Sequence, residues 1–287
     1  MKVLAFGEVL WDVFPDDKYI GGAPFNFAAH LAKYGEDVFL LSSVGNDSLG
    51  KETLSVINDF SVNSEFVAVS DKPTGRCVVT LDEKKVPSYD LKSDVAYDYI
   101  ECYNLPNNFD VLYFGTLALR SEYNYNSLSS LLNANTFKEI FCDVNIRAPY
   151  YNINSVELCL KNATIIKISD EEMSVVAKLI SFDGELNYKN FAKYLRERYS
   201  NLKLIIITLG ENGSYCLDCK NNTEHSAVAI KVEVASTVGA GDSFSAAFLH
   251  KYLCFCNLDE CINFASKVAA FVVSKIGAVP NYNPESI

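Results

Sequence analysis

Apolar residues along the chain fall into short runs that alternate with segments of helical periodicity. The apolar runs predict strands at residues 2–9, 37–43, 110–115, 138–143, 163–168 and 203–208. The helical segments lie at 24–34, 48–59, 121–134, 154–161, 170–180 and 188–199, with two longer ones near 240–253 and 258–275. Strands that alternate with helices predict an α/β fold, in which helices cover both faces of a mostly parallel sheet.

Residues 62–100 interrupt this alternation. The segments 76–81 and 86–90 are strand-like, and no helical pattern separates them. They predict a small antiparallel sheet that projects from the main body. An ordinary extension of the main sheet is the alternative interpretation.

Composition limits the classes of partner. A chain of 287 residues with 49% hydrophobic content can bury one substantial core. Its net charge of −11 argues against nucleic-acid and anionic membrane surfaces, so an ATP site has to use local positive groups. Glu8 and Asp12 interrupt the apolar start, which is typical of a first strand and not of a signal peptide. No apolar stretch approaches the roughly 20 residues of a membrane span. We therefore expect a cytoplasmic protein without nucleic-acid or membrane partners.

The nine cysteines favour reduced thiols, because the number is odd and nothing indicates secretion. Cys216 and Cys219 form a CxxC pattern, but residues 214–219 look like a strand, where side chains three apart point to opposite faces. Three further cysteines cluster later in the chain, at positions 254, 256 and 261. The histidines share no ligand spacing, so we expect no zinc site.

The phrase TVGAGDSF at residues 237–244 precedes a long apolar helical stretch. Gly239 and Gly241 flank Ala240 and allow a tight turn into a helix, whose first amides point outward. The helix dipole adds positive charge there, which favours an anion such as a phosphoryl group. Asp242 would lie beside that anion, placed to take a proton from an attacking hydroxyl. The alternative is an ordinary glycine-rich helix start with Asp242 as a dipole partner.

A second motif, GGAPFNFAAHLAKYG, begins at Gly21 with a Gly-Gly turn and continues with Pro24 at a helix start. Asn26, in the first turn, can both donate to and accept from a polyol. Together the two motifs resemble the signatures of the ribokinase-like (PfkB) carbohydrate kinases, and the resemblance runs over nearly the whole chain. It implies a single domain, 1–287, with a ribokinase-like three-layer α/β/α core. It also implies a β-sheet lid over the sugar, formed by about 12–20 and 62–100.

The resemblance also implies the active-site residues. Asp242 would be the base, and the amides of Gly239, Ala240 and Gly241 would hold the transferred phosphoryl group. Asp12 follows the first strand, and by resemblance Asp12, Gly22 and Asn26 bind sugar hydroxyls. The stretch CDVNIRAPYY is similar to the D-x-N-x-R-x-P segment of fructokinases and 2-keto-3-deoxygluconate kinases, which implies that Asn145 and Arg147 lie near the triphosphate and the sugar.

Two further segments match the family's nucleotide and metal motifs. IKISDEE stands where the family has N-x-x-E, a motif linked to magnesium and phosphate, and TLGENG resembles its T-x-G-x-x-G. The implied ATP-binding residues, besides Asn145, are Lys167, Ser169, Thr208, Gly210 and Gly213. Glu172 would orient water bound to the Mg²⁺ that accompanies ATP. Ser169 and Glu172 equally form a Ser-x-x-Glu capping box, which needs no chemistry.

One position departs from the family pattern. The residue before Thr237 is usually Asp, which helps to build a monovalent-cation site, and here it is Ser236. Serine carries no charge, which makes activation by a monovalent cation doubtful.

The function that follows is ATP-dependent phosphorylation of a primary hydroxyl of a sugar. Fructose is the first choice, because residues 87–91 and 95–100 resemble the lid exit of bacterial fructokinases. The alternatives are 2-keto-3-deoxygluconate or another sugar, and Arg76 and Arg120 are candidate cations for a keto acid's carboxylate. A catalytically silent sugar-binding regulator is a third hypothesis, suggested by the serines at 169 and 236. A homodimer through the lid would fit the family.

Overall fold

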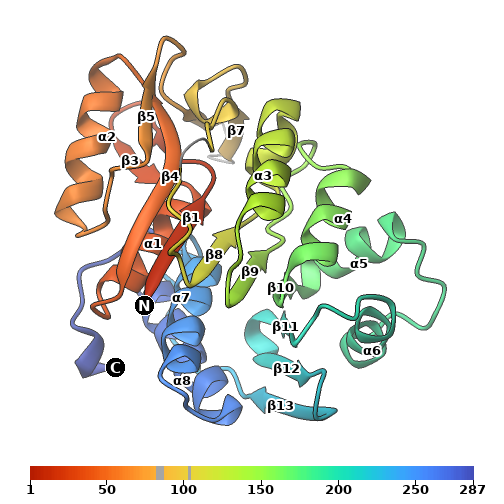
Figure 1. Cartoon of the computed structure of the whole chain (residues 1–287). Coiled ribbons are helices and arrows are strands. Elements are labelled where there is room, and N and C mark those ends of the chain that lie inside the picture. Colours follow the sequence, from red (N-terminus) through yellow and green to blue (C-terminus); the bar gives the residue numbers. More distant parts are fainter. Residues whose placement is uncertain (82–86, 103–104) are drawn as a thin grey trace.

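A nine-stranded sheet forms the centre of the protein, and a computed structural model describes it over residues 1–81, 87–102 and 105–287 (Figure 1). The strand order is β13-β12-β11-β10-β9-β8-β1-β4-β5, and all pairings from β5 to β11 are parallel. The remaining two pairings of this sheet, β11 with β12 and β12 with β13, are antiparallel. The strands are β1 (Lys2–Phe6), β4 (Asp37–Gly45), β5 (Val67–Ser70), β8 (Val111–Phe114), β9 (Glu139–Asp143), β10 (Ile165–Ser169), β11 (Leu204–Thr208), β12 (Ser214–Asp218) and β13 (Thr223–Ala227).

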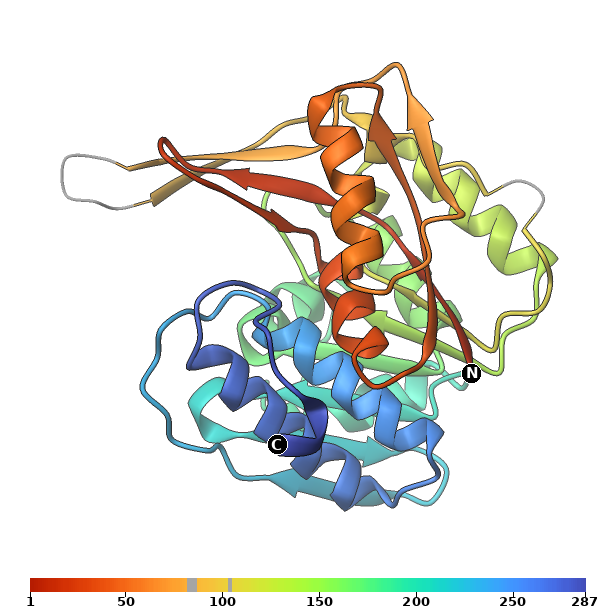
Figure 2. The same ribbon diagram turned by 90° about the vertical axis from the view of Figure 1, so that its left-hand side faces the viewer.

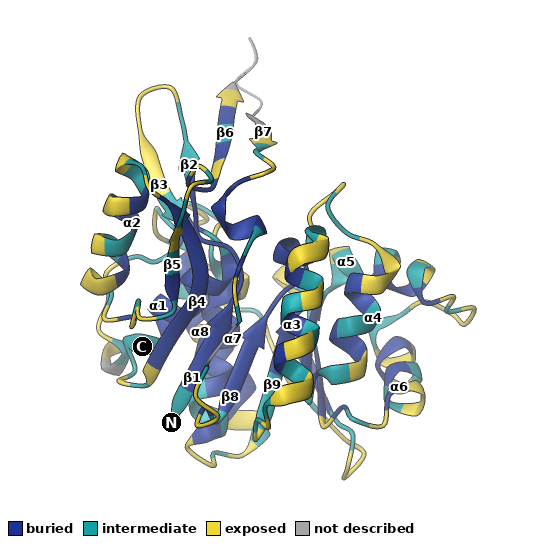
Figure 3. Ribbon diagram, turned by 45° about the horizontal axis from the view of Figure 1, so that its top comes forward, coloured by how far each residue is buried: buried dark blue, intermediate teal, exposed yellow. Residues whose placement is uncertain are grey.

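Helices cover both faces of this sheet, and each face has its own apolar core. Val3 and Ala5 of β1 belong to one core, whereas Leu4 and Phe6 belong to the other, as the alternation of side chains along a strand requires. One face carries α1 (Ala23–Ala32), α2 (Ser48–Asp59), α7 (Ala240–Leu253) and α8 (Leu258–Val273); the other carries α3 (Glu122–Ala134), α4 (Ile153–Asn162), α5 (Asp170–Leu179) and α6 (Tyr188–Arg198). The predicted three-layer fold is confirmed, and its central strands are buried (Figure 3). Among the described residues, no helix is long and apolar enough to cross a bilayer.

A second, four-stranded sheet projects from this core (Figure 2). Its order is β3-β2-β6-β7, with two antiparallel hairpins joined by a parallel pairing of β2 with β6. The strands are β2 (Leu10–Val13), β3 (Lys18–Gly21), β6 (Arg76–Leu81) and β7 (Pro87–Leu91). The predicted small sheet is therefore present, and both of the chain segments expected to supply it do so.

The small sheet uses less of the chain than the expected 62–100. β5 lies in the large sheet, parallel to β4, because the segment β4-α2-β5 is a complete βαβ unit. After β7, Ala96–Asp98 form a buried 3₁₀ turn, with the ring of Tyr97 fully enclosed. Residues 82–86, which the sequence placed in the same segment, lie outside the described residues.

Candidate active site

Five polar side chains are buried together where the carboxyl ends of β9 and β10 meet the starts of α1 and α7. They are Asn26, Asp143, Lys167, Asp242 and Ser245. Open α/β sheets bind ligands at the carboxyl ends of their strands. Buried polar groups are costly unless they are paired, and each of these five has a partner within the group.

The start of α7 has the geometry of an anion site. Gly239 has a φ of +81°, and a Cβ there would lie 2.3 Å from the carbonyl oxygen of Ala278, so only glycine fits. The amide of Ala240 donates a hydrogen bond to the carbonyl of Thr237 at 3.3 Å. The first hydrogen bond of the helix itself is donated by the amide of Ser243 to the carbonyl of Gly239. The amides at positions 241 and 242 precede that bond, and this helix end therefore attracts negative charge.

Asp242 lies on the first turn of α7 and is only 8% exposed. The side-chain amide of Asn26 donates a hydrogen bond to its Oδ2 at 2.8 Å. Burial and the negative charge of Asp143 raise the pKa of Asp242 to about 6, while the bond from Asn26 and the charges of Lys167 and Arg147 oppose the rise. Such a carboxylate is ionised at neutral pH and is more basic than an ordinary aspartate, as a general base requires.

Lys167 and Asp143 form a buried ion pair under this helix start. The Lys167 ammonium donates to both carboxylate oxygens of Asp143, at 2.9 and 2.8 Å, and the hydroxyl of Ser245 donates to the same carboxylate at 2.9 Å. A Cβ on Gly241 would lie 3.2 Å from the Lys167 nitrogen, so the cation touches the first turn of α7. Although burial opposes its charge, Asp143, Glu172 and Asp242 raise the pKa of Lys167. The sequence selected Lys167 but missed its partner Asp143, and also Ser245, which donates to Asp143.

Glu8 is a further buried carboxyl that the sequence analysis did not select. Its Oε1 accepts a hydrogen bond from the amide of Ala23 at 3.2 Å, at the first residue of α1. Burial raises the pKa of Glu8 to about 7, and the charge of Asp242 adds to the rise. Gly22, which directly precedes Ala23, has a φ of +105°. A Cβ at this position would lie 2.5 Å from the carbonyl oxygen of Glu8. Gly22 is therefore required by the backbone itself.

The positive charge of Arg147 acts both on Asp12 of the small sheet and on Asp242 at the start of α7. Its side chain is exposed, after the end of β9. The charge of Arg147 lowers the pKa values of Asp12, Glu8 and Asp242, against the burial that raises all three. Asp12 is half-buried on β2. The arrangement brings one guanidinium into the field of three carboxyls.

Glu172 and Ser169 form the capping box at the start of α5. The Ser169 amide donates to Oε2 of Glu172 at 2.8 Å, and the Glu172 amide donates to the Ser169 hydroxyl at 3.3 Å. Oε1 of Glu172 accepts from the amide of Ile146 at 2.6 Å. The structural interpretation is confirmed, and Glu172 additionally holds the loop that carries Asn145 and Arg147.

We expect Glu172→Ala to lower the free energy of unfolding by about 2 kcal/mol or more, because it removes a helix cap and leaves the amide of Ile146 without its acceptor. Chemical denaturation measures the change. Glu171→Ala is the matched control, since Glu171 is an exposed acid in the same turn. Equal stabilities of the two variants would contradict this role.

The other residues predicted to bind ATP lie at the same edge of the sheet, where β9, β10 and β11 end. Ser169 and Thr208 are register partners on β10 and β11, and Asn145 follows β9 with a φ of +44°. Gly213 has a φ of +97°, and a Cβ there would lie 2.0 Å from the carbonyl oxygen of Ala227, so the hairpin itself demands glycine. Gly210, with a φ of +52°, has no atom within 4 Å of its Cβ position.

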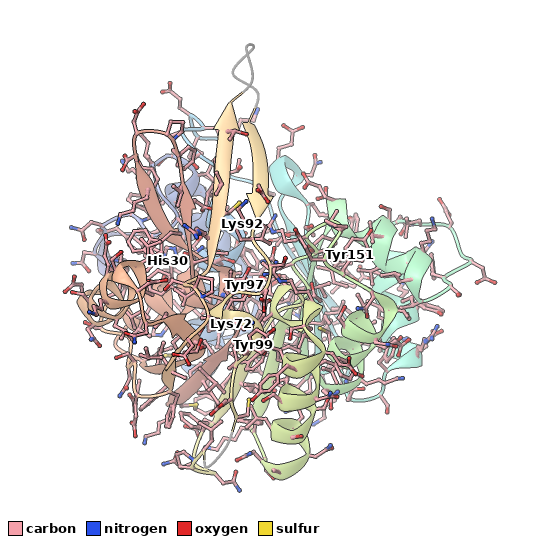
Figure 4. The ribbon with its side chains drawn as sticks, turned by 90° about the horizontal axis from the view of Figure 1, so that it is seen from above. His30, Lys72, Lys92, Tyr97, Tyr99 and Tyr151 are labelled. Atoms are coloured by element: carbon pink, nitrogen blue, oxygen red, sulfur yellow. The ribbon has the colours of Figure 1, made fainter. Side chains whose placement is uncertain are left out.

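Arg120, one candidate cation for a keto acid, is already paired. Its Nε and Nη2 donate to the carboxylate of Asp98 at 2.7 and 2.9 Å, and Nη2 also donates to the carbonyl of Lys92. Its guanidinium lies 4.9 Å from the ring centres of both Tyr97 and Tyr150 (Figure 4 labels Tyr97 and Lys92). Its positive charge is thus neutralised inside the protein.

Arg76, the other candidate, points away from the site. Asp12 of β2 is the register partner of Cys77 on β6, so these two side chains share a face of the small sheet. Neighbours along a strand alternate, which puts Arg76 on the opposite face, opposite Trp11.

The comparisons with known proteins identify the family of the chain. The sequence model of the pfkB family carbohydrate kinases matches residues 4–285. The chain therefore belongs to the pfkB family of carbohydrate kinases.

Its relatives carry the names of several sugar kinases. Fructokinase-2 of Zea mays is 27% identical, with 97% of this chain and 90% of the relative aligned. A ribokinase of Dictyostelium discoideum is 28% identical, with 91% and 86% aligned. The crystal structure of an uncharacterized sugar kinase from Pyrococcus horikoshii in complex with ATP has a TM-score of 0.81 at 25% identity, and covers 100% of this chain and 97% of that one. These relatives support an ATP-dependent sugar kinase and leave open which sugar is phosphorylated.

Proposed function

We propose that the protein transfers the γ-phosphoryl group of ATP to a primary hydroxyl of fructose, with Asp242 as the general base. The observation that carries this proposal is the buried Asp242 carboxylate, which Asn26 orients beside the anion-attracting start of α7. Asp242 takes the hydroxyl proton while the amides of the first turn stabilise the charge of the phosphoryl group in flight. Lys167 adds a fixed positive charge below the same turn.

Mg²⁺ fits this site as a companion of ATP. Both oxygens of Glu172 accept backbone hydrogen bonds, and both oxygens of Asp143 accept from Lys167, so each carboxylate is already engaged. Mg²⁺ tends to keep several waters and to bind through phosphates, which suits contact with Glu172 through a bound water. The ion would neutralise phosphate charge.

A neutral acceptor suits the charges around the site. Arg120 is neutralised by Asp98, Arg76 faces the other side of the small sheet, and Arg147 already lies in the field of three carboxyls. A keto acid would bring a further carboxylate beside Asp12, Glu8 and Asp242, and of these three arginines only Arg147 faces that group. Among the described residues this disfavours 2-keto-3-deoxygluconate, whereas Asp12 can accept hydrogen bonds from sugar hydroxyls.

We expect kcat/KM for fructose to exceed the values for 2-keto-3-deoxygluconate and ribose by at least about tenfold, which corresponds to roughly 1.4 kcal/mol of transition-state discrimination. ADP release over a panel of sugars measures it. Asp12→Ala should reduce fructose phosphorylation far more than basal ATP hydrolysis. A preference for the keto acid would refute the choice of fructose and leave the kinase assignment intact.

The small sheet is proposed to close over the sugar, because Asp12 lies on it and within the field of Arg147. Closure would exclude water from the reaction. Amide hydrogen exchange in β2, β3, β6 and β7 should slow when fructose is added, and more so together with a non-hydrolysable ATP analogue. Unchanged exchange in these strands would favour a static extension of the fold.

A further inference from the structure

Three side chains with different donor atoms meet at the far end of α7. Glu36 comes from the connection between α1 and β4, His250 lies in the last turn of α7, and Cys254 follows that helix directly. One ligand atom from each lies within 4.8 Å of the other two. This group departs from the sequence expectation of no zinc site. Glu36 is more than 200 positions away from the other two residues, so no ligand spacing in the sequence marks the group.

The spacing of His250 and Cys254 is that of a helical chelate. Cys254 is the C-cap residue of α7, and its amide still donates to the carbonyl of His250 at 3.1 Å, so the imidazole and the thiol lie one turn apart on the same side of the helix end. The ring of His250 stacks on Tyr34, with centroids 4.6 Å apart and planes 13° from parallel. This contact restricts the imidazole before any ligand binds.

Glu36 completes the group from a second element. Its Oε1 lies 3.0 Å from Nδ1 of His250, and Oε2 accepts from the amino group of Met1 at 3.0 Å. Cys254 is exposed, and among the described residues its sulfur has no hydrogen-bond partner.

We infer that Glu36, His250 and Cys254 form a site for one borderline divalent ion, with Zn²⁺ as the best match. Zinc prefers this mixture of carboxylate oxygen, imidazole nitrogen and thiolate sulfur, and three protein ligands leave a fourth position for water. The ion takes the place of the hydrogen bond between Nδ1 of His250 and Glu36, so the ring proton moves to Nε2 of the neutral imidazole. The Cys254 thiol releases its proton to solvent. The negative end of the α7 dipole also favours a cation there.

The site is separate from the proposed phosphoryl-transfer site. Asp242 lies at the beginning of α7, and His250 is eight residues further along, or about 12 Å at the helical rise. A bound ion would tie the α1–β4 connection to the end of α7, and therefore stabilise the fold without contacting either substrate.

Cobalt is the probe for this site, because a thiolate bound to Co²⁺ gives a charge-transfer band in the near ultraviolet. Full-length protein without an affinity tag is stripped with a chelator and titrated with Co²⁺. We expect the band to saturate at one ion per chain. Cys254→Ser should abolish it, and Cys256→Ser, a matched control two residues away, should retain it. His250→Gln should weaken binding by about tenfold or more.

Zinc gives a second measurement. Zn²⁺ should raise the melting temperature of the stripped wild type and not that of Cys254→Ser, while sugar phosphorylation with Mg-ATP stays equal in the two proteins. Absence of the cobalt band at millimolar ion, or an equal band in Cys254→Ser, would overturn the proposal. So would a band that is lost only in Cys256→Ser.

Discussion

Replacement of Asp242 by asparagine is expected to lower kcat about 10²–10⁴-fold at saturating ATP and sugar, the usual contribution of a general base. Asparagine keeps the shape of the side chain but cannot accept the hydroxyl proton. Steady-state kinetics measure the loss, and Asp183→Asn, the same change at an exposed position, is the control. Retention of more than about a third of the wild-type kcat would show that another group is the base.

The same variant should not be less stable than the wild type. Because the pKa of Asp242 is raised to about 6, the folded protein binds this proton more tightly than the unfolded chain does. The contribution of Asp242 to the free energy of unfolding is therefore largest below about pH 4. It falls as the pH rises from about 4 to about 6, and it is smallest above about pH 6. Asp242→Asn removes the loss, so its melting temperature at pH 7 should equal or exceed that of the wild type. Thermal melts at pH 4 and pH 7 test the sign.

Lys167→Met is expected to be the most destabilising single change in the site. It leaves the Asp143 carboxylate buried without its cation, and loss of one partner of a buried ion pair costs about 3–5 kcal/mol. Asp143 also raises the pKa of Asp242, so without Lys167 the two carboxylates repel each other more strongly. Denaturant titration and sugar phosphorylation should both show large losses.

A double variant separates stability from chemistry. Asp143→Leu together with Lys167→Met removes both charges, and apolar replacements of a buried pair are often neutral or stabilising. We expect the double variant to recover most of the stability and little of the activity, because the positive charge beneath α7 is still missing. Full recovery of activity would mean that the pair serves the fold alone.

Local patterns predicted most of the helices and strands, because each has its own periodicity and flanking signals. The predicted helix 48–59 coincides with α2, and 240–253 with α7. β5 was not predicted as a separate strand, and its residues fell inside the range 62–100 that the resemblance gave to the lid. Its place follows from its pairing with β4, which is a tertiary contact.

The sequence marked the positions where the backbone of the candidate site requires glycine. Gly22 and Gly239 need positive φ values and close approaches, and both stand in the two long motifs. Asp143 was less visible, because its importance lies in the ion pair with Lys167 on the next strand. A lysine inside the apolar strand IIKIS was nevertheless a signal, since such a cation needs a buried partner. Glu8 appeared in the sequence only as an interruption of the first strand.

The most direct test of a sugar kinase with Asp242 as its base is to follow both products of one reaction. Protein, Mg-ATP and fructose are incubated, ADP is quantified, and the sugar phosphate is identified by NMR. We expect one fructose monophosphate per ADP, with the phosphate on a primary hydroxyl, and almost none from Asp242→Asn. ADP formed without phosphorylated sugar, or equal product from both proteins, would contradict it.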